Sequence, residues 1–298
     1  MMYRIGIDLG GTKTEIIVLA EDGKEVLRRR VPSPGGSYEA TLTNIAQLVE
    51  SVEAEVGARC AIGIGTPGAI SLATGRLRNS NSTWLNGKPL GADLRTLLRR
   101  EVRIENDANC FALAEAIDGA ARGHAVVFGV ILGTGVGGGI VMDGKLLVGA
   151  NRIAGEWGHN ALPWPEGSER PGPKCYCGRS GCIETFLSGW GLSHDHEGIT
   201  GVSLVAEEIV RAAQTGELCS LATLERYEQR LAKALAHVIN ILDPHAIVLG
   251  GGLSNIERLY ETVPRLWRSW VFCDRVDTLL LRNLHGDSGG VRGAAWLW

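Results

Sequence analysis

The sequence predicts an α/β fold with two domains, and three observations lead to this expectation. Short apolar runs of strand length alternate with longer segments whose apolar residues recur at helical spacing. The chain of 298 residues is long enough to bury one large core or two smaller ones, and two are favoured. A pattern of strand, glycine-rich turn and strand near the start recurs near the middle, which predicts two related halves.

The expected elements of the first half follow from apolar spacing and from turn residues. Three strands rich in β-branched residues form a meander, and a helix and a buried strand follow it. A loop of small and polar residues then runs from Thr66 to Gly91. The predicted elements are strands at 5–7, 16–19 and 25–31, a helix at 38–55, a strand at 61–65, a helix at 93–100, a strand at 102–104 and a helix at 107–119.

The second half repeats the opening pattern and then becomes more helical. Asp243 and Pro244 end the longest expected helix, and three glycines directly follow the strand after it. The predicted elements are strands at 126–132 and 140–142, helices at 204–215 and 221–242, a strand at 246–249, a helix at 259–271, a strand at 278–281 and a helix at 290–298. We expect an N-terminal domain over 1–120 and a C-terminal domain over 121–286, with the closing helix at about 287–298 packing back on the first.

Composition limits the classes of function. With 45% hydrophobic and 21% charged residues, this is an ordinary globular chain. A net charge of −3 without a basic block argues against nucleic acid and against an anionic membrane surface. No apolar run approaches the ~20 residues that span a bilayer, and no secretory leader precedes Tyr3, so we expect a cytoplasmic protein. The 41 glycines cluster between apolar runs, which suggests backbone that approaches a ligand closely.

A cysteine-rich segment at 155–184 predicts a metal site. His159, Cys175, Cys177 and Cys182 make a tetrahedral set for zinc, and the glycines among them allow a tight turn. Four protein ligands leave no open position, so the zinc is expected to be structural. A disulfide is disfavoured by the close spacing and the odd total of seven cysteines, while unligated thiols stay an alternative. The isolated cysteines are expected to be buried core residues: Cys60, Cys110, Cys219 and Cys273.

The glycine-rich turn at 8–14 predicts a phosphate site of an uncommon kind. It matches neither the P-loop nor the dinucleotide motif, and it leads into a strand and not a helix. Successive N–H groups, with the hydroxyls of Thr12 and Thr134, would point at phosphate oxygens in two such hairpin turns. Asp8, at the end of the strand, is suited to hold Mg²⁺ directly or through water. Lys13 is as readily a solvated turn residue.

An acceptor site is predicted at the segment from Glu105 to Asn109. An aspartate at a helix start is most often an N-cap, which is one interpretation of Asp107. The functional alternative is a general base that accepts the proton of a substrate hydroxyl as that hydroxyl attacks the γ-phosphorus. Asn106 can donate to and accept from a hydroxyl, and three further side chains suit a polyhydroxylated ligand: Glu156, His159 and Glu184.

Taken together and in order, six motifs resemble the ROK family of sugar kinases and repressors over essentially the whole chain. They are Asp8-Leu9-Gly10-Gly11-Thr12-Lys13-Thr14, Glu105-Asn106-Asp107-Ala108-Asn109, the run from Leu132 to Gly139, Glu156-Trp157-Gly158-His159, Cys-x-Cys-Gly-x-x-Gly-Cys-Ile-Glu and Gly250-Gly251-Gly252. The resemblance implies an actin-like ATPase (ribonuclease H-like) fold, with two α/β domains around a nucleotide and sugar cleft and a zinc-bound loop.

The resemblance also implies roles for individual residues and the cofactors ATP, Mg²⁺ and structural Zn²⁺. Asp107 would be the catalytic base, and Asn106, Glu156, His159 and Glu184 would bind sugar hydroxyls. The zinc ligands would be His159, Cys175, Cys177 and Cys182. ATP and its metal would be bound by Asp8, Gly10, Gly11, Thr12, Lys13, Gly133, Thr134, Gly135, Gly137, Gly138, Gly251 and Gly252.

Within the family, residues 79–87 and 285–296 look most like bacterial fructokinases, including those that also accept mannose. The expected reaction is therefore phosphorylation of fructose to the 6-phosphate, with a glucokinase or an N-acetylhexosamine kinase as alternatives. A sugar-sensing repressor or a silent sugar binder is the alternative from another class. It is disfavoured because the first strand begins at Ile5, which leaves no room for a helix-turn-helix ahead of it. Family members are frequently dimers, so a homodimer is also expected.

Overall fold

The computed structural model describes residues 3–80 and 82–298, and their contacts group into two compact units. Unit 1 combines the chain up to Gly123 with Gly139–Ala154 and Asp287–Trp298. Unit 2 combines His124–Gly138 with Gly155–Gly286. The chain therefore returns twice to the first unit, and the expected domain boundary between 120 and 121 stays a prediction.

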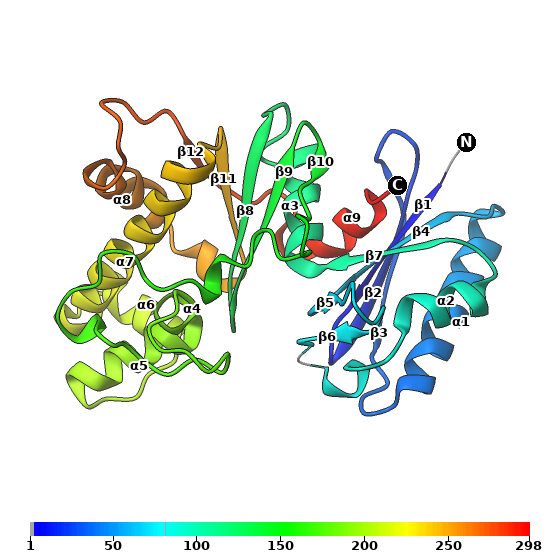
Figure 1. Ribbon diagram of the computed structural model, residues 1–298, viewed down its shortest axis with the longest axis horizontal. Coiled ribbons are helices and arrows are strands. Elements are labelled where there is room, and N and C mark those ends of the chain that lie inside the picture. The colour runs from blue at the N-terminus through cyan, green and yellow to red at the C-terminus, as the bar shows by residue number, and fades with distance from the viewer. Residues whose placement is uncertain (1–2, 81) are drawn as a thin grey trace. The chain divides into compact units, whose positions relative to one another are not determined.

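The first sheet, of five strands, is the frame of unit 1 (Figure 1). Its order is β3-β2-β1-β4-β7, in which β1, β2 and β3 are antiparallel neighbours and β1, β4 and β7 are parallel. The elements are β1 (Arg4–Leu9), β2 (Lys13–Leu19), β3 (Glu25–Pro32), α1 (Tyr38–Val56), β4 (Ala61–Thr66), β5 (Ala69–Ile70), β6 (Leu77–Arg78), η1 (Thr83–Leu85), α2 (Leu90–Leu98), β7 (Val102–Asn106), α3 (Asp107–Ile117), η6 (Gly286–Ser288) and α9 (Gly289–Ala295).

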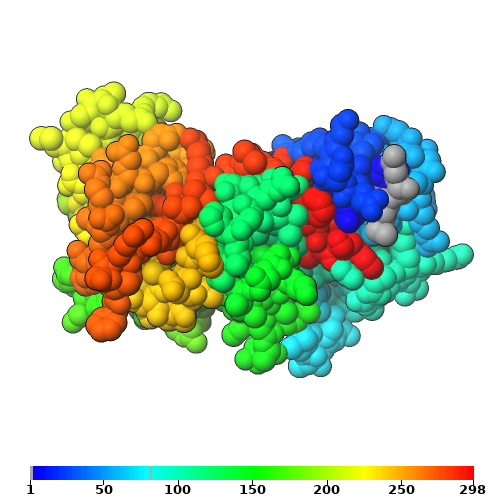
Figure 2. All heavy atoms as spheres, turned by 90° about the horizontal axis from the view of Figure 1, so that it is seen from above, coloured from blue at the N-terminus to red at the C-terminus, as the bar shows by residue number. Residues whose placement is uncertain are grey.

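Helices cover both faces of this sheet. Successive side chains of its strands point to opposite faces, and both faces are apolar. On one face, Ile5, Ile7 and Val18 pack with the apolar stripes of α1 and α2. On the other face, Ile17 and Leu19 of β2 pack against α9. Figure 2 shows the C-terminal residues, in red, against the N-terminal residues, in blue. The closing helix thus packs on the first strands of the chain.

The second sheet has the order β10-β9-β8-β11-β12. As in the first sheet, an antiparallel three-stranded meander is extended by parallel strands on one side. The two related halves predicted from the repeated pattern are thereby confirmed at the level of strand order. The elements are β8 (Val126–Leu132), β9 (Val136–Met142), β10 (Lys145–Leu146), η2 (Trp157–His159), η3 (Gly167–Glu169), α4 (Glu184–Leu187), α5 (Gly189–Thr200), α6 (Ala206–Gln214), α7 (Leu218–Leu242), β11 (Ala246–Gly250), η4 (Gly252–Asn255), α8 (Leu259–Leu266), η5 (Trp267–Ser269) and β12 (Leu279–Arg282).

Several details differ from the sequence prediction, such as the helix expected at 259–271, which ends at Leu266. Strand β9 begins at Val136, inside the glycine run that was expected to be a turn. The loop expected up to Gly91 contains the hairpin of β5 and β6, and α2 already begins at Leu90. Helix α5 was not predicted, because its three glycines weaken the helical signal. Cys219 and Cys273 are exposed, so the expectation that they are core residues was wrong.

Among the described residues, no helix combines the length and the apolar character needed to cross a membrane. Asn81, part of the segment 79–87 that resembles fructokinases, lies outside the described residues.

Candidate functional site

The carboxyl ends of three parallel strands bring the acidic residues of unit 1 together. In β1, Asp8 is paired with Gly65 of β4, and Thr66 of β4 is paired with Asn106 of β7. Because parallel strands end at the same edge of a sheet, Asp8 lies at the same edge as Asn106 and the start of α3. The sequence placed these groups almost a hundred residues apart, and the sheet unites them.

At this edge Asn106, and not Asp107, is the N-cap of α3. The Ala108 N–H donates to Asn106 Oδ1 at 2.9 Å and to Asp107 Oδ1 at 2.8 Å. Asn106 Nδ2 also donates to the Gly68 carbonyl at 3.2 Å. The N-cap interpretation of Asp107 is therefore wrong, since Asp107 is the first residue inside the helix. One of its oxygens accepts the Ala108 N–H at the helix N-terminus.

Asp8 is partly buried, and its carboxyl group is held in an unfavourable electrostatic setting. Burial, followed by the negative charges of Asp107 and Glu15, raises the pKa of Asp8 to about 6, although Lys13 and Arg30 act in the opposite direction. A crowded pair of carboxylates is a setting that a divalent cation relieves, so the donor set fits magnesium. A side chain on Gly290 would touch the Asp8 carboxyl group, with its Cβ 3.8 Å from Asp8 Cγ.

Hydrogen bonds at Gly10 hold the glycine turn after β1 in shape, and the tip of the turn is exposed. Gly10 N–H donates to the Lys13 carbonyl at 3.1 Å, and Ser33 Oγ donates to the Gly10 carbonyl at 2.7 Å. The three residues at the tip, Gly11, Thr12 and Lys13, are exposed. The turn is therefore preformed, with its tip available to a ligand.

Two ion-paired glutamates of unit 1 were not predicted from the sequence. Glu105 pairs with Arg152 and also accepts a hydrogen bond from Asn109 Nδ2 at 3.2 Å. Glu15, 2% exposed, pairs with Arg28 and Arg30 of the next strand. The alternation of β2 and β3 offered a signal for the second pair, because Glu15 and Arg30 are direct cross-strand neighbours. Arg152 is 47 positions from Glu105 and gave none.

In unit 2 the four expected zinc ligands converge. Their ligand atoms all lie within 4.8 Å of one another. Cys175 Sγ lies 3.6 Å from His159 Nδ1, and Cys177 Sγ lies 3.6 Å from Cys182 Sγ. Tetrahedral zinc with ordinary bond lengths requires separations of about 3.6–3.8 Å between ligand atoms. A sulfur–sulfur distance of 3.6 Å also excludes a disulfide between Cys177 and Cys182. These residues therefore fit zinc.

The outer nitrogen of His159 faces away from the sulfurs. Its Nε2 lies 3.0 Å from the Tyr176 hydroxyl, whose ring meets the imidazole edge-on. This contact orients the imidazole so that Nδ1 points to the metal position. Glu156, which directly precedes the short helix η2 that ends at His159, is exposed.

Glu184 joins the cysteine-rich segment to the second glycine turn. The Val136 N–H donates to Glu184 Oε2 at 2.9 Å, and a side chain on Gly135 would press on the same oxygen at 2.8 Å. At the other side of this turn, Gly251 has a positive φ of 80° and lies against the Leu132 backbone. The structure therefore gathers three predicted groups within unit 2, namely the turn at 133–135, Glu184 and the start of the turn at 251–252.

Gly137 and Gly138 serve a packing role in strand β9. Trp157 Nε1 donates to the Gly137 carbonyl at 3.0 Å. A side chain on Gly138 would collide with the Trp157 ring, since its Cβ would lie 2.8 Å from Trp157 Cδ1. These glycines thus seat the segment that carries Glu156 and His159, whereas Thr134 is exposed at the tip of the turn.

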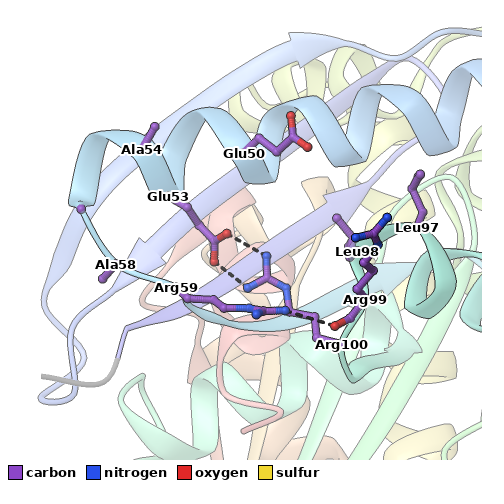
Figure 3. A pocket seen from close by; sticks show the side chains of 10 residues that line it. Glu50, Glu53, Ala54, Ala58, Arg59, Leu97, Leu98, Arg99 and Arg100 are labelled. Atoms are coloured by element: carbon purple, nitrogen blue, oxygen red, sulfur yellow. Dashed lines mark hydrogen bonds and ion pairs between the residues drawn. The ribbon is translucent and has the colours of Figure 1, made fainter.

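A groove of about 710 Å³ lies elsewhere on unit 1, at the end of α1 and α2 (Figure 3). In it Arg100 forms a bidentate ion pair with Glu53, and Arg59 donates to the Arg99 carbonyl. None of the residues that line this groove was predicted as a site residue.

Comparison with known proteins gives a consistent result. The model of the ROK family matches residues 4–298. The chain is 42% identical over 296 residues to an N-acetyl-D-glucosamine kinase of Pectobacterium atrosepticum, covering 98% of this chain and 97% of that protein.

Two crystal structures, each covering 99% of this chain, give the same result. The ROK hexokinase of Thermus thermophilus superposes with a TM-score of 0.89 at 32% identity and 97% coverage of its own chain. A ROK family glucokinase of Streptomyces griseus, solved with glucose and AMPPNP, gives 0.77 at 28% identity and 98% coverage. With the two mixed sheets, these similarities confirm the expected actin-like ATPase fold. The chain belongs to the ROK family.

Proposed function

We propose that this protein is an ATP-dependent sugar kinase that transfers the γ-phosphoryl group of ATP to a hydroxyl group of a hexose. The observation that carries the proposal is the edge of the first sheet, where Asp107 opens a helix beside Asp8 and the exposed turn at Gly11. A carboxylate for the acceptor and a turn for phosphate are the two parts that phosphoryl transfer to an alcohol requires. The names of similar proteins support the same activity.

In the proposed reaction Asp107 accepts the proton of the sugar hydroxyl as the hydroxyl oxygen bonds to the γ-phosphorus. The bond from that phosphorus to the β,γ-bridging oxygen breaks, and ADP leaves with the electron pair. Asn106 is held by Ala108 and Gly68, so it keeps the start of α3 fixed while its neighbour acts. Positioning of this kind supplies much of the rate in phosphoryl transfer.

Each unit contains residues proposed for the nucleotide, namely Asp8 and the first glycine turn in unit 1 and the turns at 133–135 and 251–252 in unit 2. Asp8 would bind the magnesium ion that accompanies ATP, directly or through water, and the charge of that ion offsets the negative charge of the phosphates. Backbone N–H groups at Gly10–Lys13 and at 133–135 suit phosphate oxygens, and the turn at 251–252 suits the nucleoside. Gly137 and Gly138 would contribute to the nucleotide site indirectly, through their packing with Trp157.

The zinc ligands would act through structure alone. With four protein ligands, zinc supplies no open coordination position. It would hold His159 while Glu184 accepts the Val136 N–H, so the sugar-binding groups and the second turn form one rigid part of unit 2.

N-acetyl-D-glucosamine is the first candidate for the sugar, with transfer to its 6-hydroxyl. Kinases of this sugar are 41–42% identical to the chain over nearly its full length. They support the N-acetylhexosamine alternative better than the fructose preference expected from the sequence. Fructose and mannose are retained as second candidates because residues 79–87 and 285–296 resemble fructokinases.

A substrate panel tests this proposal. Initial rates of ADP formation are measured with Mg²⁺-ATP and each of N-acetyl-D-glucosamine, fructose, mannose, glucose and N-acetyl-D-mannosamine. The highest kcat/KM is expected for N-acetyl-D-glucosamine. A preference for fructose above tenfold would transfer the assignment to the second candidate. Binding of a sugar by calorimetry without turnover of any member would replace the kinase with a silent sugar binder.

A further inference from the structure

Within unit 1, the described residues 78–80 and 82–86 form a bridge between the acceptor edge and the first glycine turn. At one end, Gly68 packs so tightly on this segment that its Cβ would lie 2.3 Å from the Arg78 carbonyl and 2.8 Å from Ser80 N. The Gly68 carbonyl accepts from Asn106, the residue that precedes Asp107. The bridge therefore packs on Gly68, which holds Asn106, the neighbour of the proposed base.

The bridge is held in a fixed shape by a reciprocal pair. Ser80 N–H donates to Asn86 Oδ1 at 2.9 Å, and Asn86 Nδ2 donates back to the Ser80 carbonyl at 2.8 Å. Ser82 N–H donates to Ser80 Oγ at 3.2 Å. These bonds fix the backbone of Ser82 without using its side chain.

The Ser82 hydroxyl ends at the phosphate turn. A Cβ on Gly11 would lie 3.1 Å from Ser82 Oγ, so the hydroxyl lies next to Gly11 at the tip of the turn. Ser82 is 2% exposed, and its Oγ has no hydrogen-bond partner among residues 3–80 and 82–298. Ser82 precedes η1, yet its side chain does not cap it. On the opposite side of the turn, Ser33 Oγ is fully engaged with Gly10 and Thr14.

A buried hydroxyl without a partner destabilises a fold, and alanine at this position would remove that cost. Such groups are found where a protein keeps a polar atom for a later step. Here the hydroxyl lies between a turn suited to phosphate and a segment tied to the acceptor.

We propose that Ser82 is a catalytic residue whose hydroxyl donates a hydrogen bond to an oxygen of the phosphoryl group during its transfer. The hydroxyl keeps its proton throughout, and no covalent bond to serine forms. Because the hydroxyl is buried next to Gly11, the proposed contact requires a shift of the turn and is absent when substrates first bind. An interaction of this kind raises kcat and leaves the KM values nearly unchanged. This inference rests on the proposed kinase activity.

The test compares Ser82→Ala with Ser80→Ala. For Ser82→Ala we expect a fall in kcat of about 10–100-fold, the range for one hydrogen bond to a charged group. The KM values for ATP and for the sugar should each change less than about threefold, and the Tm should stay equal or rise. Ser80→Ala removes a satisfied hydroxyl in the same segment, so its Tm should fall while its kcat changes less.

Each other outcome has a definite meaning. An unchanged kcat in Ser82→Ala, beside an active wild type, would overturn the inference and leave the kinase proposal intact. A loss confined to the KM for sugar or for ATP would overturn it as well, because Ser82 would then be a ground-state contact of that substrate. A lower Tm with a proportionate loss of activity would show a structural role. If the wild type itself turns over no sugar, the kinase proposal fails and the inference fails with it.

Discussion

Two carboxylates stand at the edge of the first sheet, and the fold treats them differently. One oxygen of Asp107 accepts a hydrogen bond from the Ala108 N–H at the start of α3. Burial and the neighbouring negative charges raise the pKa of Asp8 to about 6. Neighbouring carboxylates in different environments can have different roles. Here Asp107 is the proposed base, and Asp8 is the proposed magnesium ligand.

The raised pKa of Asp8 predicts a pH-dependent cost to stability. Between the ordinary value of 3.8 and about 6 the folded state binds more protons at this site than the unfolded state. The free energy of unfolding therefore falls as pH rises through this window. Asp8→Asn removes the charge, so the variant should be more stable at pH 7.5 by about 1–2 kcal/mol, a figure reduced for the partial exposure of the side chain.

Urea unfolding of both proteins in EDTA, at pH 7.5 and pH 4.5, measures this effect. The advantage of Asp8→Asn should shrink at pH 4.5, where the wild-type carboxyl group is protonated in the folded state. An advantage of equal size at both pH values, or a less stable variant at pH 7.5, would show that Asp8 is not strained by charge.

At the residue scale, the sequence could identify groups that are adjacent in a motif. Asp8, Asn106 and Asp107 were accessible in this way because strand ends and helix starts have local signals. Ser82 and Arg152 were not, since their roles depend on neighbours brought by tertiary packing. The N-cap assignment also required coordinates, because two successive polar residues compete for the same N–H.

Among the elements, α9 is joined to unit 1 by contacts that only glycine permits. A Cβ on Gly293 would lie 1.6 Å from the Cys110 carbonyl in α3, and one on Gly63 would lie 1.8 Å from the Ala294 carbonyl. Backbone therefore packs directly on backbone, which fixes α9 next to Asp8 through Gly290.

Gly293→Ala should accordingly destabilise the protein by about 2–4 kcal/mol, because neither helix backbone can move away without losing its packing. Gly198→Ala is the matched control. Gly198 lies within α5 with nothing near its missing side chain, so alanine there should stabilise by about 0.5–1 kcal/mol. Urea unfolding measures both. Equal effects of the two substitutions would contradict the close packing of α9.

The segment that carries the zinc ligands is anchored on α7 by buried charges. Arg230, with a side chain 6% exposed, pairs with Glu169 and with Asp195 of α5, both at 2.8 Å. Lys233 Nζ donates to the Trp164 carbonyl at 2.9 Å. The segment thus has two supports, the contacts of Trp164 and Glu169 with α7 and the metal ligands, which flank those two residues in the sequence.

Removal of the metal should weaken one support. We expect about one zinc per chain by mass spectrometry of the purified protein, and none in Cys177→Ser. This variant should have a lower Tm and a severalfold higher KM for the sugar, because His159 and Glu184 lose their fixed positions. Cys273→Ser, which alters an exposed cysteine outside the cluster, should retain zinc and the wild-type Tm. A folded, zinc-free Cys177→Ser with an unchanged KM would separate the metal from sugar binding.

Long apolar patterns made most elements predictable. A high glycine content obscured helix α5 and the start of strand β9. The strands of both meanders and the helices α1 and α7 follow from periodic apolar residues. Helix α5 is begun by the Ser188 cap and completed by packing, which overrides its weak intrinsic propensity. In β9 the pairing with β8 outweighs the turn preference of three successive glycines.

For the whole molecule, the repeated strand order shows why the fold was more predictable than the substrate. Two sheets of one order require only that each half keeps its apolar pattern. Selection among hexoses rests on a few hydroxyl-sized differences in a pocket, which are worth little free energy and leave no pattern in one sequence. The expected homodimer also stays a prediction, and light scattering of the eluted protein tests it.

The central claim is that Asp107 serves as the base in a sugar-dependent transfer of the γ-phosphoryl group. The most direct measurement follows ³¹P NMR spectra of ATP, Mg²⁺ and the preferred hexose of the substrate panel with wild-type protein or Asp107→Asn. The wild type should convert ATP to equal amounts of ADP and a sugar phosphate, only when sugar is present. Asp107→Asn should still bind the sugar by calorimetry but form product at least about 100-fold more slowly. Wild-type rates in Asp107→Asn, or ADP formed without sugar phosphate, would contradict the claim.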